Sequence, residues 1–596
     1  MPIAGFLAPM YHPTSGMMTK LVCKLMKNNI ITLILLLAPA LTLQGDALNP
    51  ERVFVHTDRN IYVAGEDMLY SFFLYGNPDS DAISTAGYLE LININNAAVA
   101  QSRLILDNGF GHGVLSIPDS LTTGLYMLSG YTRFMRNYGE ETFFSQAIVI
   151  YNPFKENLKT AKQDTVPYTL AEKEYTAKSV NIENTGLTEN KFGTRKKVSM
   201  RLKLDSATFS RPELCNLSIS VAVSSSIIPE KKISTFTQAL KNGYPPDSTD
   251  GNNLLFGETT GPYLEGSLIS RETLEPVKNR RLYLSIPGKS NYLSYYDSDD
   301  KGNFRFLVPS FRGNREFIIQ VADFRDDIII KTGNPFAGRH EWFTDGNIHF
   351  TEKLLDYASR LGVNYQVNKI YETGQPEADN TDRTDTGFFR FYGEPDIEVF
   401  LDDYIDLPTM EEVFHELVPG VALRRRGDGA GFVFVSEPGD PPLPGPDAVF
   451  LDGVILDDPS FIAGLDPELI ERIDVIKGKY QIGNLILNGI VSIVSLEGGM
   501  CDIDYPNTGL RTSLTILEEE SRYKNMDYSV NQCYDPIMPD FRNTLYWNPT
   551  LKPDDEGMIE FTFHTSDFVS DYLITLQGIT DRDEAIYYSK KIIVTR

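Results

Sequence analysis

The sequence predicts a mainly β, multi-domain protein, built from tandem β-sandwiches with one small α+β domain among them. Its 596 residues exceed what one hydrophobic core organises, and a chain of this length suggests about four domains. Apolar and polar residues alternate in stretches such as "VSMRLKLD", "FRFLVP" and "MIEFTFH", which is the pattern of half-buried strands. The chain also holds 45 glycines and 34 prolines, so turns are expected to separate many short strands.

Composition places the chain among acidic globular proteins. Hydrophobic residues make up 42% of the chain and charged residues 23%, which is typical of folded rather than disordered proteins. Asp plus Glu number 81 against 55 Lys plus Arg, a formal net charge of -26. Such a surface repels nucleic acid and anionic lipid, so neither is expected as a partner. The charge serves either ordinary solubility or an acidic binding surface.

Residues 1–46 are predicted to be an export signal with an over-extended start. Met26 is the expected initiator, Lys27 supplies a positive charge, and residues 30–43 form an apolar core of 14 residues. A core of that length is short for a membrane span but typical of a secretory signal. The mature chain is expected to begin between Leu43 and Asn49. No later run of about 18 apolar residues exists, so no transmembrane span is expected.

The cysteines are too sparse for a disulfide-rich scaffold or a zinc site. There are 4 in the chain, and Cys23 is expected to leave with the signal. Export and parity lead to the hypothesis that Cys501 and Cys533 form a disulfide. The alternative is that each of these two is buried singly. Cys215 is expected to be a buried, unreactive thiol.

Residues 47–152 form the first predicted module. "VHTDRNIYVAGEDMLYSFFLYG" gives a strand, a turn at residues 64–66 and a second strand, and "NGFGHGVLSIPDSLTTGLYMLSGYT" adds further strands. This order resembles the second macroglobulin-type (MG2) domain of large bacterial envelope proteins, with Ala64 where those proteins usually have proline. The resemblance implies an immunoglobulin-like β-sandwich. The Cys-Gly-Glu-Gln thioester of protease-trapping macroglobulins is absent, so covalent protease trapping is not expected. Residues 165–240 are expected to form a second sandwich of this kind.

Residues 262–335 are the next predicted sandwich. "LEGSLISRETLEPVKNRRLYLSIPG" reads as strand, turn and strand, and "YYDSDDKGNFRFLVP" places an aspartate-glycine turn before another strand. These stretches resemble a carboxypeptidase-regulatory-like domain, which is a small non-catalytic sandwich in that family. Asp297, Asp299 and Asp300 lack the spacing and the terminal glutamate of a calcium loop, so a tight turn is favoured.

Residues 336–390 are predicted to be a linker that contains a helix. Leu354, Leu355, Ala358 and Leu361 lie at helical spacing and would share one face.

Residues 391–498 are predicted to form the α+β domain. "LPTMEEVFHELVPGV" predicts a helix that ends at a proline and a glycine, and a two-stranded hairpin follows. "AVFLDGVIL" predicts a buried strand with a turn at Asp452 and Gly453. In "LDPELIERIDVIKG", Asp466 suits the N-cap and Pro467 the first turn of a short helix, with a strand after it.

Three motifs in this region resemble the plug domain of TonB-dependent receptors. The matching residues are Leu451, Asp452, Gly453 and Val454; Glu471, Ile473, Val475, Lys477 and Gly478; and Asn488, Gly489, Ile490, Val491 and Ile493. The receptors enclose the plug in a barrel of about 22 strands, which needs over 200 residues. Residues 496–596 are too few for it and are predicted to form a C-terminal sandwich over 505–596. The chain is therefore not expected to be a transporter.

Searches for catalytic patterns lead to the prediction that the chain has no catalytic, cofactor-binding or metal site. HExxH, GxSxG, a Walker loop and a strand-linked GxGxxG are all absent from the sequence. His415 and Glu416 are adjacent, so they do not face one another on a helix. Arg424, Arg425 and Arg426 are the one basic run in an acidic region. They are interpreted either as a solvated hairpin strand or as a site that docks an acidic partner.

The function predicted from these features is that of a non-catalytic, exported envelope protein, a scaffold or accessory subunit that contacts a periplasmic or outer-membrane protein. Two alternatives stay open: a periplasmic or surface module that binds glycan or peptide, and a hydrolase without a recognisable motif, since fold resemblance does not carry chemistry. The sequence sets no oligomeric state.

Overall fold

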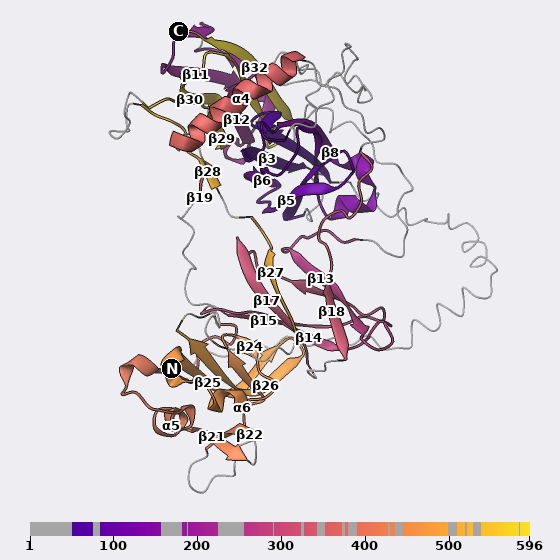
Figure 1. Cartoon of the computed structure of the whole chain (residues 1–596), viewed down its shortest axis with the longest axis vertical. Helices are drawn as coiled ribbons and strands as arrows, with labels where there is room; N and C mark the ends of the chain where they lie inside the picture. The colour runs from indigo at the N-terminus through magenta and orange to yellow at the C-terminus, as the bar shows by residue number, and fades with distance from the viewer. Residues whose placement is uncertain are drawn as a thin grey trace, which may run out of the picture. The chain divides into compact units, whose positions relative to one another are not determined.

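The computed structural model describes residues 51–75, 84–155, 182–186, 189–224, 255–289, 291–322, 327–342, 352–371, 376–378, 390–426, 429–435, 445–496, 498, 503, 509–518, 521–528, 538–582 and 584–596. The protein is mainly β, as predicted, with several separate sheets (Figure 1). The predicted export signal, Cys23, Cys501 and Cys533 lie outside the described residues. Short 3-10 helices join strands at η1 (Phe134–Asn137), η2 (Glu140–Thr142), η3 (Ser206–Thr208), η4 (Pro212–Leu214), η7 (Leu401–Asp403) and η8 (Pro467–Leu469).

The N-terminal sandwich pairs a three-stranded sheet, order β1-β3-β6, with a five-stranded sheet, order β2-β8-β7-β4-β5. Its strands are β1 (Arg52–Thr57), β2 (Ile61–Val63), β3 (Asp67–Tyr75), β4 (Ala86–Ile92), β5 (Ala98–Ile105), β6 (Phe110–Ser116), β7 (Gly124–Tyr131) and β8 (Phe144–Tyr151). The expected turn at 64–66 is present: the Glu66 N–H donates to the Val63 carbonyl at 3.0 Å, and Gly65 has a φ of +93°. Glycine adopts that conformation without a steric cost.

The composite sandwich combines strands from two distant parts of the chain. Its sheets have the orders β10-β32-β31-β12-β29 and β30-β11-β9. Its strands are β9 (Ile182–Asn184), β10 (Lys191–Phe192), β11 (Lys197–Leu204), β12 (Asn216–Val223), β29 (Thr544–Leu551), β30 (Met558–His564), β31 (Asp571–Ile579) and β32 (Ala585–Val594). In β11, every second residue is buried, as its alternating sequence predicts.

This pairing corrects the expectation of two separate sandwiches in residues 165–240 and 505–596. Both neighbours of β12, which are β29 and β31, come from the C-terminal stretch. The N-terminal stretch contributes only four strands, and β9 and β10 have three and two residues. A sheet of so few, short strands exposes its apolar face unless other strands cover it. The strands of residues 165–240 and 505–596 therefore form one sandwich together.

The central sandwich has sheets of the orders β16-β13-β18 and β15-β14-β17-β27. Its strands are β13 (Tyr263–Ser270), β14 (Arg281–Ile286), β15 (Tyr292–Asp297), β16 (Asn303–Leu307), β17 (Asn314–Val321), β18 (Ile328–Thr332) and β27 (Leu510–Thr515). Asp299 forms the tight turn favoured above: its Oδ1 accepts from the N–H groups of Lys301 at 2.9 Å and Asn303 at 2.7 Å. Asp297 instead pairs with Arg281 at 2.8 Å.

The α+β module, residues 391–498, is built on a five-stranded sheet of order β20-β25-β26-β23-β24. Its elements are β20 (Ile397–Phe400), α5 (Met410–Glu416), β21 (Val421–Arg426), β22 (Gly429–Phe434), β23 (Ala448–Leu451), β24 (Val454–Ile455), α6 (Ser460–Ala463), β25 (Ile470–Ile482) and β26 (Leu485–Ser495). The helix, the hairpin and the turn at Asp452–Gly453 form where expected, and Thr409 caps α5 by accepting from the Glu412 N–H at 3.3 Å.

The short helix expected after Asp466 is wrong. Asp466 does accept from the Glu468 N–H at 3.1 Å, but it caps only the 3-10 turn η8. From Ile470 onward the chain is strand β25, because its residues pair on both sides with β20 and β26. The N-cap at Asp466 is confirmed, whereas sheet pairing decides the conformation of the residues that follow.

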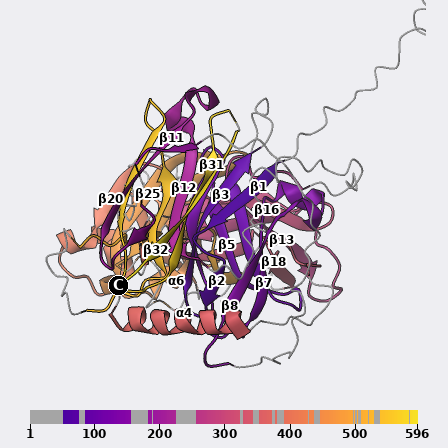
Figure 2. The same ribbon diagram turned by 90° about the horizontal axis from the view of Figure 1, so that it is seen from above.

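The path of the chain is nested. It leaves the composite sandwich after β12 and later passes through α4 (Glu352–Tyr371) and the α+β module. It then closes the central sheet with β27. Strand β28 (Ser521–Tyr523) pairs with β19 (Pro376–Ala378), which precedes the module, before the chain returns to the composite sandwich. Helix α4 lies along β2 and β8 (Figure 2), and Leu354 and Leu361 join the core of the composite sandwich. Among the helices of the described residues, none combines the length and apolar character that a membrane crossing requires.

Candidate functional site

The basic run Arg424–Arg426 ends strand β21 in the α+β module. Arg424 and Arg425 are exposed. The Arg425 guanidinium is ion-paired with Glu411 of α5, and this carboxylate raises the Arg425 pKa through a hydrogen bond. The run therefore has an acidic partner inside its own module, and its role in docking an acidic protein stays a prediction.

Cys215 is buried and not in a disulfide. Burial raises the pKa of its thiol, and the Sγ lies 3.8 Å from the Arg211 carbonyl oxygen. A thiol held neutral in this way is a poor nucleophile. This environment is the unreactive one expected from the sequence, while the proposed Cys501–Cys533 bridge falls outside the described residues.

Three exposed large apolar side chains of the α+β module lie at the end of β20 or directly after it. We name residues Phe400–Asp406 the acidic ridge. Within it, Ile405 is 80% exposed, Tyr404 50% and Phe400 38%, whereas Leu401 packs on the module core. Large apolar groups gathered on a surface are a common mark of an interaction site.

The acidic ridge lies in a stretch of one charge sign. Residues 394–416 contain nine carboxylates and no lysine or arginine. In the ridge itself, Asp402, Asp403 and Asp406 are exposed, and within the described part of the chain none of them has a cationic partner. The surface therefore combines uncovered apolar groups with uncompensated negative charge.

Strand β20 leads directly into the ridge and lies at the edge of its sheet. It pairs only with β25 in the described part of the chain, in a register that sets Val399 opposite Ile473 and Phe400 opposite Arg472. An edge strand presents backbone donors and acceptors to another chain unless something covers them.

A buried ion pair lies in β25, the strand next to β20. In β25, Arg472 Nε lies 3.1 Å from Oδ1 of Asp474, and the two side chains are 1% and 0% exposed. The Tyr392 hydroxyl donates to Asp474 at 2.7 Å. The Arg472 guanidinium carbon lies 5.7 Å from the centre of the Phe400 ring, within the range of a cation-π contact. Phe400 is thus held at the start of the ridge.

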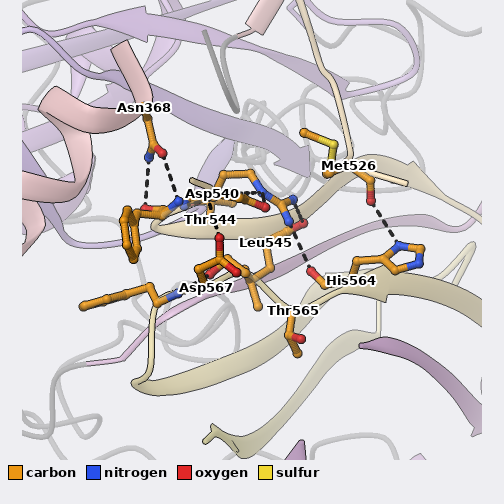
Figure 3. Close-up of polar contacts among 12 residues, drawn as sticks. Asn368, Met526, Asp540, Thr544, Leu545, His564, Thr565 and Asp567 are labelled. Carbon is orange, nitrogen blue, oxygen red and sulfur yellow. Dashed lines mark hydrogen bonds and ion pairs between the residues drawn. The ribbon is translucent and has the colours of Figure 1, made fainter. Parts of the chain in front are cut away.

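A second buried ion pair lies in the composite sandwich (Figure 3). Arg542 donates to Asp540 at 2.9 Å, to the Leu545 carbonyl at 3.0 Å and to the His564 carbonyl at 3.3 Å. Its surroundings raise the Arg542 pKa: burial opposes the charge, but Asp540 outweighs it. Arg542 is 1% exposed, so this network joins β29 and β30 inside the sandwich.

One contact has the atoms of an activated nucleophile. His56 Nδ1 lies 2.6 Å from Ser218 Oγ, within the distance at which a histidine base activates a serine. His56 is 2% exposed and Ser218 0%, so substrate has no access to the pair. Burial lowers the His56 pKa to about 3, which is far from the value that suits a base at neutral pH. The pair is structural.

Sequence reasoning missed the acidic ridge and both buried ion pairs. The run of carboxylates around the apolar residues of "DDYID" was the one available signal for the ridge. The buried pairs leave no comparable pattern, because an arginine and an aspartate two residues apart also occur on exposed strands. In the described residues no group of three His, Cys, Asp or Glu side chains is arranged to hold a metal ion.

The strand pairing defines a mainly β, multi-domain protein. No family model matches the chain, and no curated protein matches it. Among solved structures, Salmonella alpha-2-macroglobulin reacted with methylamine aligns at 9% identity and a TM-score of 0.22, over 91% of this chain and 39% of that one. Trypsin-activated alpha-2-macroglobulin from Escherichia coli aligns at 10% identity and a TM-score of 0.23, over 92% and 42%.

This chain therefore spans about two fifths of the length of the macroglobulins that it matches. At these TM-scores the likeness adds nothing to the fold, which rests on the strand pairing described above.

Proposed function

We propose that the protein is a non-catalytic, exported scaffold of a bacterial envelope, and that its α+β module holds a partner protein at the periplasmic or outer-membrane side. One observation carries the proposal: Ile405, 80% exposed, stands among three carboxylates beside an edge strand. Burying a side chain of this size is worth about 2 kcal/mol, and protein interfaces gather such contacts.

The remaining modules suit a supporting role. The α+β module is attached to the central sandwich at both ends: Arg390 forms a bridge with Asn291 before the module, and β27 joins the central sheet after it. The buried histidine, arginine and aspartate side chains described above are bound to other buried side chains or to the backbone. Buried groups bonded in this way stabilise the fold, so a partner protein would be bound by exposed residues.

Site-specific photo-crosslinking in cells tests this function. A photoreactive phenylalanine analogue replaces Tyr404 of the α+β module in the full-length chain, and in a second strain it replaces Phe154 of the N-terminal sandwich. Phe154 is 82% exposed, so both probes meet solvent and the comparison isolates the module. A covalent adduct with an envelope protein from position 404, and none from 154, is the expected result. Equal labelling from both positions, or a protein that stays in the cytoplasm, would contradict the proposal.

A further inference from the structure

We propose that the acidic ridge and β20 bind an extended, lysine- or arginine-rich segment of the partner, which adds to the sheet as a strand and buries Ile405. The inference rests on the proposed function and specifies its partner. The Arg424–Arg426 run predicts an acidic partner. The acidic ridge indicates a basic partner instead, because its exposed surface is negative.

The edge supplies the backbone half of the binding site. Strand β20 pairs through four residues with β25, and a partner strand would continue the sheet on its other side. Main-chain hydrogen bonds give such complexes affinity without requiring a particular sequence. The Glu398 side chain is ion-paired with Arg390, the residue directly before the module.

The ridge supplies the side-chain half. Side chains of an added strand alternate between the two faces of the sheet, so apolar residues at every second position are suited to meet Ile405 and Tyr404. Cationic residues at the intervening positions would meet Asp402, Asp403 and Asp406. Charge of one sign on the protein attracts the opposite sign and accelerates association.

The same charges argue against a second copy of this chain as the occupant. Two copies would bring identical ridges together, each with the same uncompensated carboxylates, in a protein whose formal net charge is -26. Like charges placed opposite one another destabilise a pair of strands. The ridge carboxylates attract a basic partner, whereas they repel a second copy of this chain.

The direct test uses defined peptides and the full-length protein. The probe is a fluorescent peptide of about ten residues with alternating lysine and valine. The controls are a peptide of the same composition with its lysines grouped together, and one with glutamate in place of lysine. Fluorescence anisotropy measures affinity at low and high salt, and hydrogen exchange locates the amides that become protected. We expect the alternating peptide to bind at least about tenfold more tightly than either control, and to protect amides of residues 397–400.

Matched variants separate the ridge from the general charge of the protein. Asp402→Lys with Asp403→Lys is compared with Asp555→Lys plus Glu556→Lys, an exposed pair in the composite sandwich that changes the net charge equally. The ridge variant should weaken binding about tenfold at low salt and the control variant less than about twofold. Ile405→Asp should weaken it at both salt concentrations. Ile405→Ser is a milder second variant, and circular dichroism checks that every variant is folded.

Several results would overturn the inference: equal binding of the alternating and grouped peptides, equal effects of the two charge variants, or no protection of β20. A protein that forms dimers in sedimentation analysis, and becomes monomeric when Ile405 is replaced, would show that a second copy occupies the ridge. If crosslinking from position 404 still captures an envelope protein while Ile405→Asp and the ridge charge variant leave its yield unchanged, the proposed function stands and this binding mode fails.

Discussion

Nε2 of His340 lies 3.0 Å from a carboxylate oxygen of Glu90, a residue with no exposed surface. The other ring nitrogen of His340, Nδ1, lies 2.5 Å from Glu140. Glu90 also accepts a hydrogen bond from Tyr131 at 2.6 Å, and the Tyr131 hydroxyl accepts from the Ala337 N–H at 2.7 Å. The chain that follows β18 is thereby fastened to the N-terminal sandwich through one histidine between two carboxylates.

The first prediction concerns the pH dependence of this attachment. Burial lowers the His340 pKa, but Glu140 and Glu90 outweigh it and raise the pKa from 6.5 to about 9. Below pH 6.5 the histidine is protonated in both folded and unfolded chains, and its stabilising contribution is complete. As the pH rises from 6.5 to 9 the unfolded chain loses the proton first, so up to about 3 kcal/mol of stability disappears.

Urea unfolding between pH 6 and 9.5 measures this effect. His340→Gln should be less stable than the wild type at pH 6 and should lose less stability as the pH rises. His415→Gln is the matched control, because that histidine is exposed and, within the described residues, pairs with Glu416 alone. Parallel pH profiles for the wild type and His340→Gln would contradict the prediction.

The second prediction concerns His56, whose effect on the pH dependence of stability has the opposite sign to that of His340. Burial lowers the His56 pKa to about 3, so the folded chain keeps His56 neutral while the unfolded chain gains a proton below pH 6.5. Stability should therefore fall as the pH falls from 6.5 toward 3. NMR of the imidazole carbons, assigned with a His56→Gln variant, should show no titration of His56 between pH 8 and 4.5. A midpoint inside that interval would show that the ring is reached by water.

The third prediction tests the buried pair of Asp540 and Arg542. Asp540→Asn removes the charge that compensates a fully buried guanidinium, so the free energy of unfolding should fall by about 3–5 kcal/mol. Glu560→Gln is the matched control, because Arg201 and Glu560 form an ion pair in the same sandwich with side chains 61% and 59% exposed. That change should cost less than about 1 kcal/mol. Equal losses in chemical denaturation would mean that burial does not strengthen the pair.

The fourth prediction concerns packing between the α+β module and the central sandwich. Gly453 has a φ of +84°, and a Cβ added there would lie 2.3 Å from the Cβ of Asn291. Gly453→Ala should lower the free energy of unfolding by about 2 kcal/mol or more. Gly478→Ala, where a Cβ would meet no atom within 4 Å, should be nearly neutral. If both variants melt at the same temperature, the two modules do not press together at this glycine.

Local pattern explains which elements could be predicted from the sequence. In β11, alternation alone identifies a strand, because its polar residues face solvent and its apolar ones the core. The turns at Gly65 and at Asp299 follow from residues with special backbone or side-chain chemistry. These features depend on neighbours a few positions away, so one sequence suffices to find them.

Long-range pairing explains what could not be predicted. Nothing in β12 indicates that its neighbours lie more than 300 residues later, at β29 and β31. In β25, Arg472 and Asp474 are polar by sequence but buried, because their side chains form an ion pair along the same strand. The acidic ridge could not be predicted for the opposite reason. Tyr404 and Ile405 are apolar and would be expected in the core, but Leu401 and Leu407 pack inward instead and leave these two side chains facing solvent.

The last prediction concerns the start of the mature chain. Glu51 is 5% exposed, and its carboxylate accepts hydrogen bonds from the Ser84 N–H at 2.6 Å, the Ser84 hydroxyl at 2.9 Å and the Thr132 hydroxyl. Burial raises the Glu51 pKa, and these donors oppose the rise. Removing the carboxylate leaves buried donors unpaired, so Glu51→Ala should cost about 1–3 kcal/mol.

An export cleavage must therefore spare Glu51. We expect N-terminal sequencing of the exported protein to begin between Leu43 and Asn49. A chain engineered to start at Val53 should melt at a lower temperature than one that starts at Asn49, by a margin similar to that of Glu51→Ala. Exported protein that retains Met1 or Met26 would contradict the cleavage. A Val53 start as stable as the longer chain would show that Glu51 does not fasten the first strand.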